Sequence, residues 1–203
     1  MEKNTFSDQI EELAKFIRVN FPSGPVHLVG LSYGGALSWG LSCRYPELVG
    51  RVVLINPMPP EPRAGFQWLG LRVVLNLPIG KRMVAAMLKT KWGKGLLMTA
   101  AEIFRNVANE PSLDRMKSLE GRKLLFMSHL IERFSWILRN ENWSMWQHKL
   151  EYWIPDTLFI CDDQDPLIRF SAYEELAQLM GCDNFFTTSG AGHISVLNSP
   201  QLI

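Results

Sequence analysis

The sequence has few cysteines and lacks the common metal- and nucleotide-binding motifs. Its three cysteines, Cys43, Cys161 and Cys182, are an odd set without a Cys-x-x-Cys pair. This set argues against a disulfide framework and favours a reducing, cytoplasmic compartment. No His, Cys and Asp cluster has metal-ligand spacing, and neither G-x-x-x-x-G-K-[ST] nor G-x-G-x-x-G occurs. We therefore expect no metal ion and no nucleotide cofactor.

The sequence also lacks a strong net charge and a long hydrophobic run. Its 21 Lys and Arg nearly balance 20 Asp and Glu, which gives no global reason to expect nucleic-acid binding. The longest uncharged run, 19–43, contains prolines and several glycines and is a poor membrane span. The first residues are polar and acidic, unlike a signal peptide. A hydrophobic content of 47% in 203 residues predicts one globular domain with room for an inserted subdomain.

Charge is unevenly distributed along the chain. Between Met58 and Leu150 there are 15 Lys and Arg against 7 Asp and Glu, and the remaining residues have a balance of −7. The same stretch holds 7 of the 9 methionines and 5 of the 7 tryptophans. The pattern indicates a mildly acidic framework that is interrupted by a basic insert rich in Met and Trp.

The framework alternates between strand-like and helix-like segments. The predicted strands are the short apolar runs 26–30, 51–56, 157–161 and 184–188. Thr5 with Asp8 can cap a helix before the first strand, and Ser171 with Glu174 has the same pattern at the start of the last helix, which Gly181 ends. Such alternation predicts an α/β fold, with a parallel sheet, helices on both faces and its chemistry at the carboxyl ends of the strands.

The loop after the first predicted strand carries Gly30-Leu-Ser32-Tyr-Gly34, which fits G-x-S-x-G between a strand and a helix. A serine on so sharp a turn needs small neighbours, and Gly30 and Gly34 would let the strand and the helix pass closely. The backbone N–H of Tyr33, at the start of the helix, is placed to donate a hydrogen bond to an oxyanion. Ser32 is therefore a candidate nucleophile.

Two later loops carry groups that could activate this serine. The turn after the third predicted strand offers Asp162, Asp163 and Asp165, and the loop after the fourth offers His193. A serine hydroxyl needs a base to remove its proton, and the base needs a third group that fixes its tautomer. The chain order Ser, Asp, His is that of the hydrolases with a nucleophile elbow.

The segments HLVGLSYGGALS, LFICDDQDPLI and SGAGHIS resemble the nucleophile, acid and histidine motifs of the α/β-hydrolase superfamily. The resemblance runs from about residue 6 to the end of the chain and is weakest in the insert. It implies an α/β-hydrolase fold in which Ser32 is the nucleophile, Asp165 the acid and His193 the base. It also implies that the amide of Tyr33 helps to form the oxyanion hole.

The sequence departs from the family pattern at the acid. Asp162 stands where such proteins usually have a glycine, so Asp163 remains an alternative to Asp165 as the triad acid. Some relatives place the acid after the preceding strand, but Asn56 stands there in this chain.

The resemblance implies two domains. Residues 1–56 and 153–203 correspond to the hydrolase core, and 57–152 to a helical cap over the active site. Apolar residues at helical spacing, such as Leu69, Val73 and Leu77, predict helices in the cap. Its Met and Trp residues either pack the cap on the core or contact a greasy acyl chain.

The implied activity is that of a serine hydrolase that cleaves a carboxylic ester or thioester through an acyl-enzyme, without a cofactor. The basic insert adds the hypothesis of an anionic substrate or carrier, such as an acyl group on an acidic acyl carrier protein or on coenzyme A. A solvated helical face is the alternative explanation of that charge. Because fold does not fix function, a lyase, a haloperoxidase and a binding protein with an impaired triad are the competing interpretations.

Part of the family pattern has no counterpart in this sequence. Only 31 residues precede Ser32, whereas full-length relatives have several more strands before the elbow. No H-G-G-type segment is present to supply a second oxyanion donor. We therefore expect the second half of a hydrolase sheet, with an unpaired, apolar edge at the strand 26–30.

Overall fold

The structure, a computed structural model, describes residues 5–60, 137, 140–165 and 167–193. The helices and strands of these ranges are, in chain order, α1 (Phe6–Asn20), β1 (Val26–Leu31), α2 (Tyr33–Arg44), the short 3₁₀ helix η1 (Pro46–Leu48), β2 (Val49–Ile55), α9 (Trp143–Leu150), β3 (Thr157–Asp162), α10 (Phe170–Leu179) and β4 (Phe185–Thr188). The helices that the sequence predicts in the first part of the insert, around Leu69 to Leu77, lie outside the described residues.

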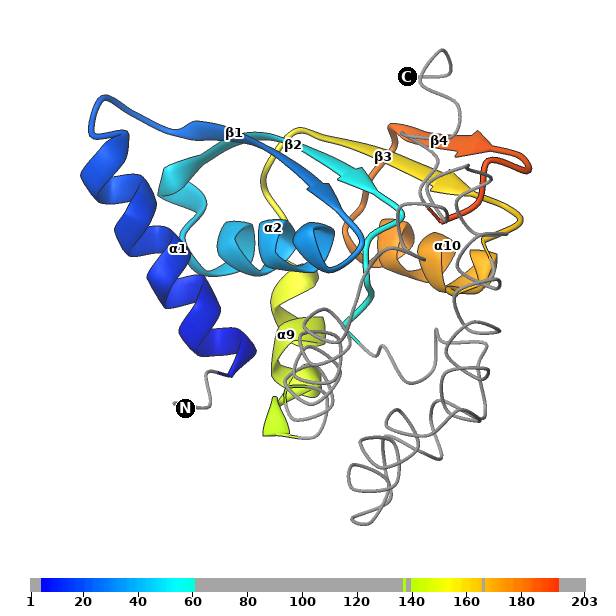
Figure 1. Cartoon of the computed structure of the whole chain (residues 1–203), viewed down its shortest axis with the longest axis horizontal. Helices are drawn as coiled ribbons and strands as arrows, with labels where there is room; N and C mark the ends of the chain where they lie inside the picture. The colour runs from blue at the N-terminus through cyan, green and yellow to red at the C-terminus, as the bar shows by residue number, and fades with distance from the viewer. Residues whose placement is uncertain (1–4, 61–136, 138–139, 166, 194–203) are drawn as a thin grey trace, which may run out of the picture.

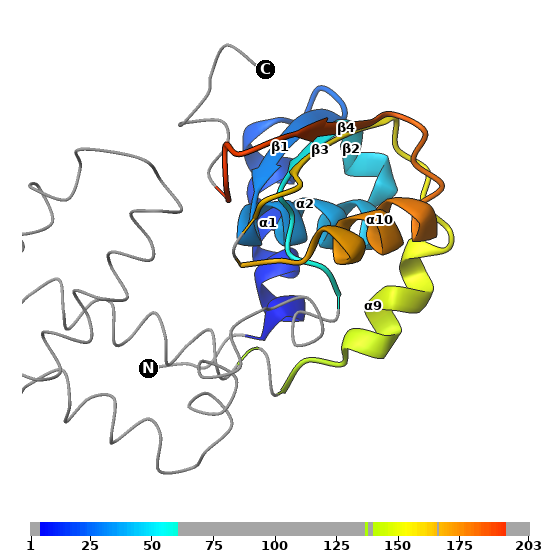
Figure 2. The same cartoon turned by 90° about the vertical axis from the view of Figure 1, so that its right-hand side faces the viewer.

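The four strands form one parallel sheet in the order β1-β2-β3-β4. Helices α1, α2 and α10 lie below this sheet in Figure 1, and the turned view in Figure 2 places them on the same side. The predicted α/β class, a parallel sheet with flanking helices, is confirmed. Within the described ranges the helices cover one face of the sheet rather than both.

The two faces of the sheet have different surroundings because alternate residues of a strand point to opposite sides. Val52 of β2 and Phe159 of β3 are on the face that the helices cover, and both are buried. Val29, Leu158 and Phe186 point the other way and are 73%, 41% and 52% exposed. Apolar side chains therefore line an open face that no helix of the described residues covers.

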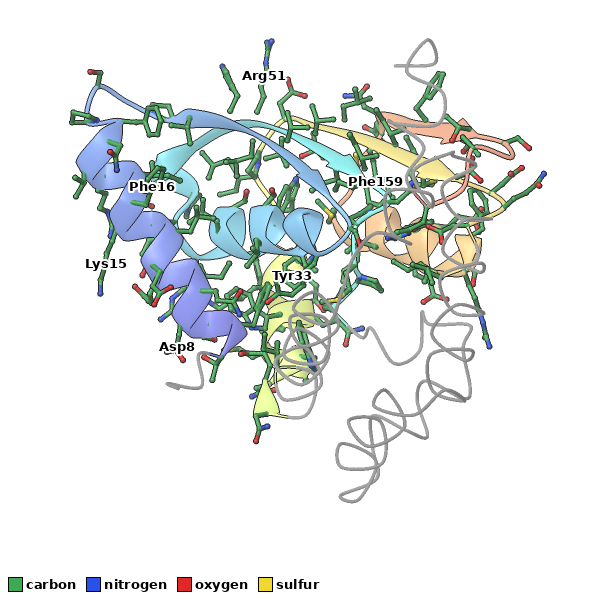
Figure 3. All side chains as sticks on the ribbon, in the orientation of Figure 1. Asp8, Lys15, Phe16, Tyr33, Arg51 and Phe159 are labelled. Atoms are coloured by element: carbon green, nitrogen blue, oxygen red, sulfur yellow. The ribbon has the colours of Figure 1, made fainter. Side chains whose placement is uncertain are left out.

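Strand β1 lies at one edge of the sheet. It pairs with β2 on one side, and no other strand of the described ranges lies on its second side. The edge expected at this strand is thus found within the part of the chain that the structure describes. Arg51, near the start of β2, projects from the open face (Figure 3) and lies 3.2 Å from Asp156.

Helix α1 begins and packs as its sequence predicts. The Thr5 hydroxyl accepts a hydrogen bond from the amide of Asp8, and the Asp8 carboxylate accepts one from the amide of Thr5, which completes the expected capping box. Phe6 and Ile10 are fully buried and lie so close to Gly40 of α2 that a Cβ there would come within 2.8 Å of both. A glycine in α2 thus allows the two helices to approach closely.

The predicted start of the last helix was wrong by two residues, because Ser171 was expected to be its N-cap. Helix α10 begins at Phe170, and Arg169, its N-cap, makes no side-chain capping bond, so Ser171 lies inside the helix. The predicted end is confirmed, because Gly181 adopts the left-handed φ of 59° that closes such a helix.

None of the helices in the described ranges has both the length and the apolar character needed to cross a bilayer.

Helix α9 belongs to the stretch that the sequence assigns to the cap, and it packs on α1 and α2. Trp146 is fully buried, with its ring centroid 5.9 Å from that of Trp39 and 5.2 Å from that of Phe6. Its indole N–H donates a hydrogen bond to Glu141, which also binds the amide and hydroxyl of Ser7. For this tryptophan, packing on the core is the observed role.

Candidate active site

Ser32 occupies the sharp turn between β1 and α2. Its backbone has φ 53° and ψ −118°, a conformation that side chains with a Cβ disfavour. The Ser32 amide donates to the carbonyl of Ile55 at 3.0 Å, and its carbonyl accepts from the amides of Ala36 and Met58 at 3.1 and 2.9 Å. Bonds to the end of β2, to the following helix and to the segment after β2 therefore hold the strained turn in place.

Two glycines allow this turn to pass close to its neighbours, and one of them differs from the prediction. A Cβ on Gly30 would lie 2.5 Å from the Ser38 hydroxyl oxygen, as the strand-to-helix packing argument requires. Among the described residues, a Cβ on Gly34 would meet nothing within 4 Å beyond its own helix, so the same crowding is not seen at Gly34. Gly35, which the sequence reasoning missed, is the second crowded position, 2.7 Å from Pro57.

The structure brings Ser32, Asp165 and His193 together. The Nε2 atom of His193 lies 2.7 Å from the Ser32 Oγ, and its Nδ1 lies 2.6 Å from the Asp165 Oδ2. Because a carboxylate only accepts hydrogen bonds, Nδ1 is assigned the proton, and Nε2 is left to accept from the serine hydroxyl. The side chains of His193 and Asp165 are only 7% and 0% exposed, so this pair is screened little by water.

Asp165, rather than Asp163, contacts the histidine. The Asp165 Oδ1 accepts hydrogen bonds from the amides of Leu167 and Ile168 at 2.7 and 3.1 Å, which fixes the carboxylate in the turn after β3. Asp163 is exposed, and its amide is bound to the carbonyl of Thr188. Sequence spacing alone had left both carboxylates open.

Tyr173 of α10 is a further partner of this carboxylate that the sequence reasoning missed. Its hydroxyl donates a hydrogen bond to the Asp165 Oδ2, the same oxygen that faces His193. Burial, together with the neighbouring Asp165 charge, raises the pKa of Tyr173 well above its usual value. The phenol therefore stays protonated and remains a donor. Its sequence signal is weak, since a tyrosine on the buried face of a helix is commonly a core residue.

The N-terminus of α2 supplies the candidate oxyanion donor. Tyr33 is the first residue of this helix, and the N–H groups of the first turn of a helix point out of its N-terminus. The phenol of Tyr33 binds the side chain of Gln9 on α1 at 3.1 Å and lies on the helix side of the sheet (Figure 3). The side chain thus links the first turn of α2 to α1.

Asn56 and Asp162 are two more buried polar residues next to the site. The sequence analysis considered both residues only in the search for the triad acid. Each lies at the carboxyl end of a strand and has 0% exposure. Asn56 has a left-handed φ of 42°. The sequence signal that could have identified them is their position, because each is a polar residue at the end of an apolar strand.

The other histidines and the cysteines have structural surroundings. His27 accepts a hydrogen bond from the amide of Arg51 at 2.9 Å, as a framework residue would. His148 lies on the surface, 3.1 Å from Glu151, and His129 lies outside the described residues. In the described part of the chain, no three His, Cys, Asp or Glu residues are arranged to hold a metal ion.

Two cysteines are unsuited to act as nucleophiles. Burial raises the pKa of the Cys43 thiol to about 12, and it raises that of Cys161 to about 12 as well. Thiols with such pKa values are almost entirely protonated near pH 7, and the thiolate is the reactive form. Ser32 is therefore a better candidate nucleophile than either cysteine.

Comparison with models of protein families shows the family of this chain. A family model of the alpha/beta hydrolase fold matches residues 2–200, so the chain belongs to the α/β-hydrolase family. No curated protein matches the sequence.

Solved structures show the same fold at low sequence identity. A hydrolase from Pseudomonas aeruginosa PA01 is 21% identical with a TM-score of 0.65, and a thermophilic esterase from Thermogutta terrifontis is 17% identical with a TM-score of 0.63. Each match covers 98% of this chain and 69% of the other. A candidate lipase from Acinetobacter baumannii AYE is 16% identical with a TM-score of 0.59. This match covers 98% of this chain and 64% of the lipase. The chain thus spans about two thirds of the length of these proteins.

Proposed function

We propose that this chain is a serine hydrolase that cleaves a carboxylic ester or thioester through an acyl-enzyme. The observation that carries the proposal is the continuous hydrogen-bonded path from Ser32 through His193 to Asp165, at 2.7 and 2.6 Å. These residues come from three separate loops at the carboxyl ends of β1, β3 and β4. Acyl transfer requires a nucleophile, a base and an orienting carboxylate within hydrogen-bonding distance of one another.

The first half of the reaction would form the acyl-enzyme. The Ser32 Oγ attacks the carbonyl carbon of the substrate while His193 Nε2 takes the serine proton. Asp165, held by two backbone amides, stabilises the imidazolium that results. His193 then gives its proton to the leaving alcohol or thiol as the tetrahedral intermediate collapses. The N–H of Tyr33 and the dipole of α2 would stabilise the negative oxygen of that intermediate.

The second half would return the enzyme to its starting state. A water molecule attacks the acyl carbon, and His193 takes one proton of that water through Nε2. The proton then passes to the Ser32 oxygen as the carboxylic acid leaves. No cofactor takes part in this sequence, and its atoms balance as ester or thioester plus water giving acid plus alcohol or thiol.

The proposed substrate is an acyl ester with an apolar acyl group. The esterase and the candidate lipase among the similar structures support an acyl ester. An apolar acyl group would suit the Met- and Trp-rich insert if those residues line the site.

Labelling with a fluorophosphonate probe tests the proposed nucleophile. The probe phosphonylates an activated serine with loss of fluoride, and we expect peptide mass spectrometry to place the adduct on Ser32. Ser42 is an internal control, because it lies in α2, the helix that follows Ser32, but is buried, and its hydroxyl donates to the carbonyl of Ser38. Heat-denatured protein should take up no probe. A folded sample without an adduct on Ser32 would contradict the proposal and favour a binding protein with an impaired triad.

The basic insert leads us to propose an anionic substrate or carrier. The stretch from Met58 to Leu150 has eight more basic than acidic residues. Raising the ionic strength from 0.01 to 0.15 M shortens the Debye length from about 30 to about 8 Å. We expect kcat/KM for an acyl ester on coenzyme A or on an acidic carrier protein to fall several-fold over this range. A neutral p-nitrophenyl ester is the control. Equal responses of both substrates to salt would rule out the electrostatic role.

A further inference from the structure

Two buried polar side chains outside the proposed triad meet at the ends of β2 and β3. Asn56 directly follows β2, and Asp162 is the last residue of β3. The Asn56 Oδ1 accepts a hydrogen bond from the amide of Asp162 at 2.9 Å. Both side chains are fully buried, and such groups are costly to bury unless they are hydrogen-bonded. Their remaining bonds therefore indicate what they hold in place.

Asn56 holds the backbone of the proposed base. Its Nδ2 donates to the carbonyl of His193 at 2.8 Å and to that of Gly192 at 3.3 Å. Asparagine is also among the few residues other than glycine that readily adopt a left-handed φ such as the 42° seen here. The residue type thus suits both the backbone turn after β2 and the donation to the histidine loop.

Asp162 holds the same loop through a separate set of bonds. Its Oδ2 accepts from the amide of Ala191 at 2.8 Å and from the hydroxyl of Thr188 at 2.9 Å. Its Oδ1 accepts from the amide of Gln164 at 3.0 Å, in the turn that carries the proposed acid. One carboxylate therefore joins the acid turn, the end of β4 and the histidine loop.

The histidine loop contains two glycines with a left-handed backbone. Gly190 and Gly192 both have a φ of 74°, and glycine gives a backbone more accessible conformations than any other residue. The two bonds described above fall on either side of Gly192, one at the amide of Ala191 and one at the carbonyl of His193. They limit the freedom of the loop at the point where the ring of His193 must be aimed.

We propose that Asn56 and Asp162 form a brace that positions His193 between Ser32 and Asp165. The proposal rests on the proposed hydrolase function. Neither side chain contacts Ser32 or the histidine ring in the bonds described, so both are positioning residues. A displacement of about 1 Å in a reacting group can cost about 100-fold in rate, so loss of the brace should be visible in kinetics.

Two nearly isosteric variants remove the brace. Asn56→Asp keeps the shape and the tolerance of a left-handed backbone, but it turns an acceptor toward two carbonyl oxygens. Asp162→Asn places an NH₂ group against the amide of either Ala191 or Gln164, whichever way the new side chain is oriented. We expect each variant to lower kcat and the rate constant for fluorophosphonate labelling by about 10- to 100-fold, with little change in KM.

Ser189→Ala is the matched control. The Gln164 Nε2 donates to the Ser189 hydroxyl at 3.2 Å, so this pair also joins the acid turn to the histidine loop, but at the exposed surface. The rate in this variant should stay within about twofold of wild type, because exposed contacts contribute little. A thermal melt of each variant shows whether it is folded.

Proton NMR separates a positioning role from a purely structural one and does not depend on activity. The Nδ1 proton of His193, bound to a buried carboxylate, should give a far-downfield signal that His193→Ala lacks. We expect this signal in wild type and Ser189→Ala and expect it to be weakened or lost in folded Asn56→Asp and Asp162→Asn.

The outcomes distinguish the two proposals. Absent labelling of wild type with the downfield signal intact contradicts the hydrolase function while the NMR comparison still decides the brace. Wild-type labelling rates and an unchanged signal in both folded variants would overturn the brace, and so would a wild type without the signal. If the isosteric variants do not fold, Asn56→Gly, which keeps the left-handed backbone, decides in the same way: a wild-type rate there overturns the proposal.

Discussion

Ser32→Ala is expected to lower kcat for an activated ester on the order of 10⁶-fold, because the nucleophile of a triad acts as a unit with its base. The Ser32 Oγ lies 2.7 Å from His193 Nε2, and an alanine leaves the base with no proton to accept. The folded state should be retained, since the backbone at residue 32 is held by its own amide and carbonyl bonds. Initial rates at high enzyme concentration, with a thermal melt of the same samples, measure both quantities.

Ser42→Ala is the control for this variant. Ser42 lies in α2, ten residues after Ser32, and its hydroxyl bonds only to the carbonyl of Ser38 among the bonds described. Its kcat should equal that of wild type within about twofold, because the Ser42 side chain contacts none of the three proposed triad residues in the bonds described and alanine favours a helix more than serine does. Turnover by Ser32→Ala at the wild-type rate would mean that a different residue carries the reaction.

Asp165→Asn is expected to lower kcat by about 10⁴-fold through the tautomer of His193. The amides of Leu167 and Ile168 both donate to Oδ1, so the oxygen of the new side chain will stay at that position. Its NH₂ group must then take the place of Oδ2 and donate to the histidine Nδ1. That exchange moves the ring proton from Nδ1 to Nε2. A protonated Nε2 can no longer accept the proton of Ser32. Steady-state kinetics on a p-nitrophenyl ester measure the loss.

Asp163→Asn separates the two carboxylates that the sequence left open. Asp163 is exposed and makes its described bond through the backbone, so the substitution should leave kcat unchanged. A large loss in Asp163→Asn together with near-normal turnover in Asp165→Asn would reverse the assignment of the acid.

The strands and the elbow could be predicted because their signals are local. The apolar runs around Val29, Val53 and Phe159 became neighbouring strands of one parallel sheet, and Thr5 caps α1 as its spacing to Asp8 indicated. A serine between a strand and a helix is likewise a local pattern. The family match over residues 2–200 agrees with the fold inferred from these motifs.

The remaining details depend on contacts between segments distant in sequence. Spacing cannot show that Asp165 turns inward while Asp163 turns to solvent, because both lie in the same short turn. The crowding at Gly35 arises from Pro57, which follows a different strand. The hydrogen bond from Asn56 to His193 joins residues 137 positions apart. Sequence patterns indicate periodicity and local turns, and they cannot show contacts between segments that are distant in sequence.

The strained backbone of Ser32 sets activity against stability at a single position. A non-glycine residue in such a conformation costs about 1–3 kcal/mol, a sizeable share of the roughly 5–15 kcal/mol by which a domain is stable. Glycine would adopt the φ of 53° without that cost, and it would have no hydroxyl to present to His193. A lineage selected for durability alone would drift toward glycine at residue 32. The proposed role of the Ser32 hydroxyl as a nucleophile gives a reason for serine at this strained position.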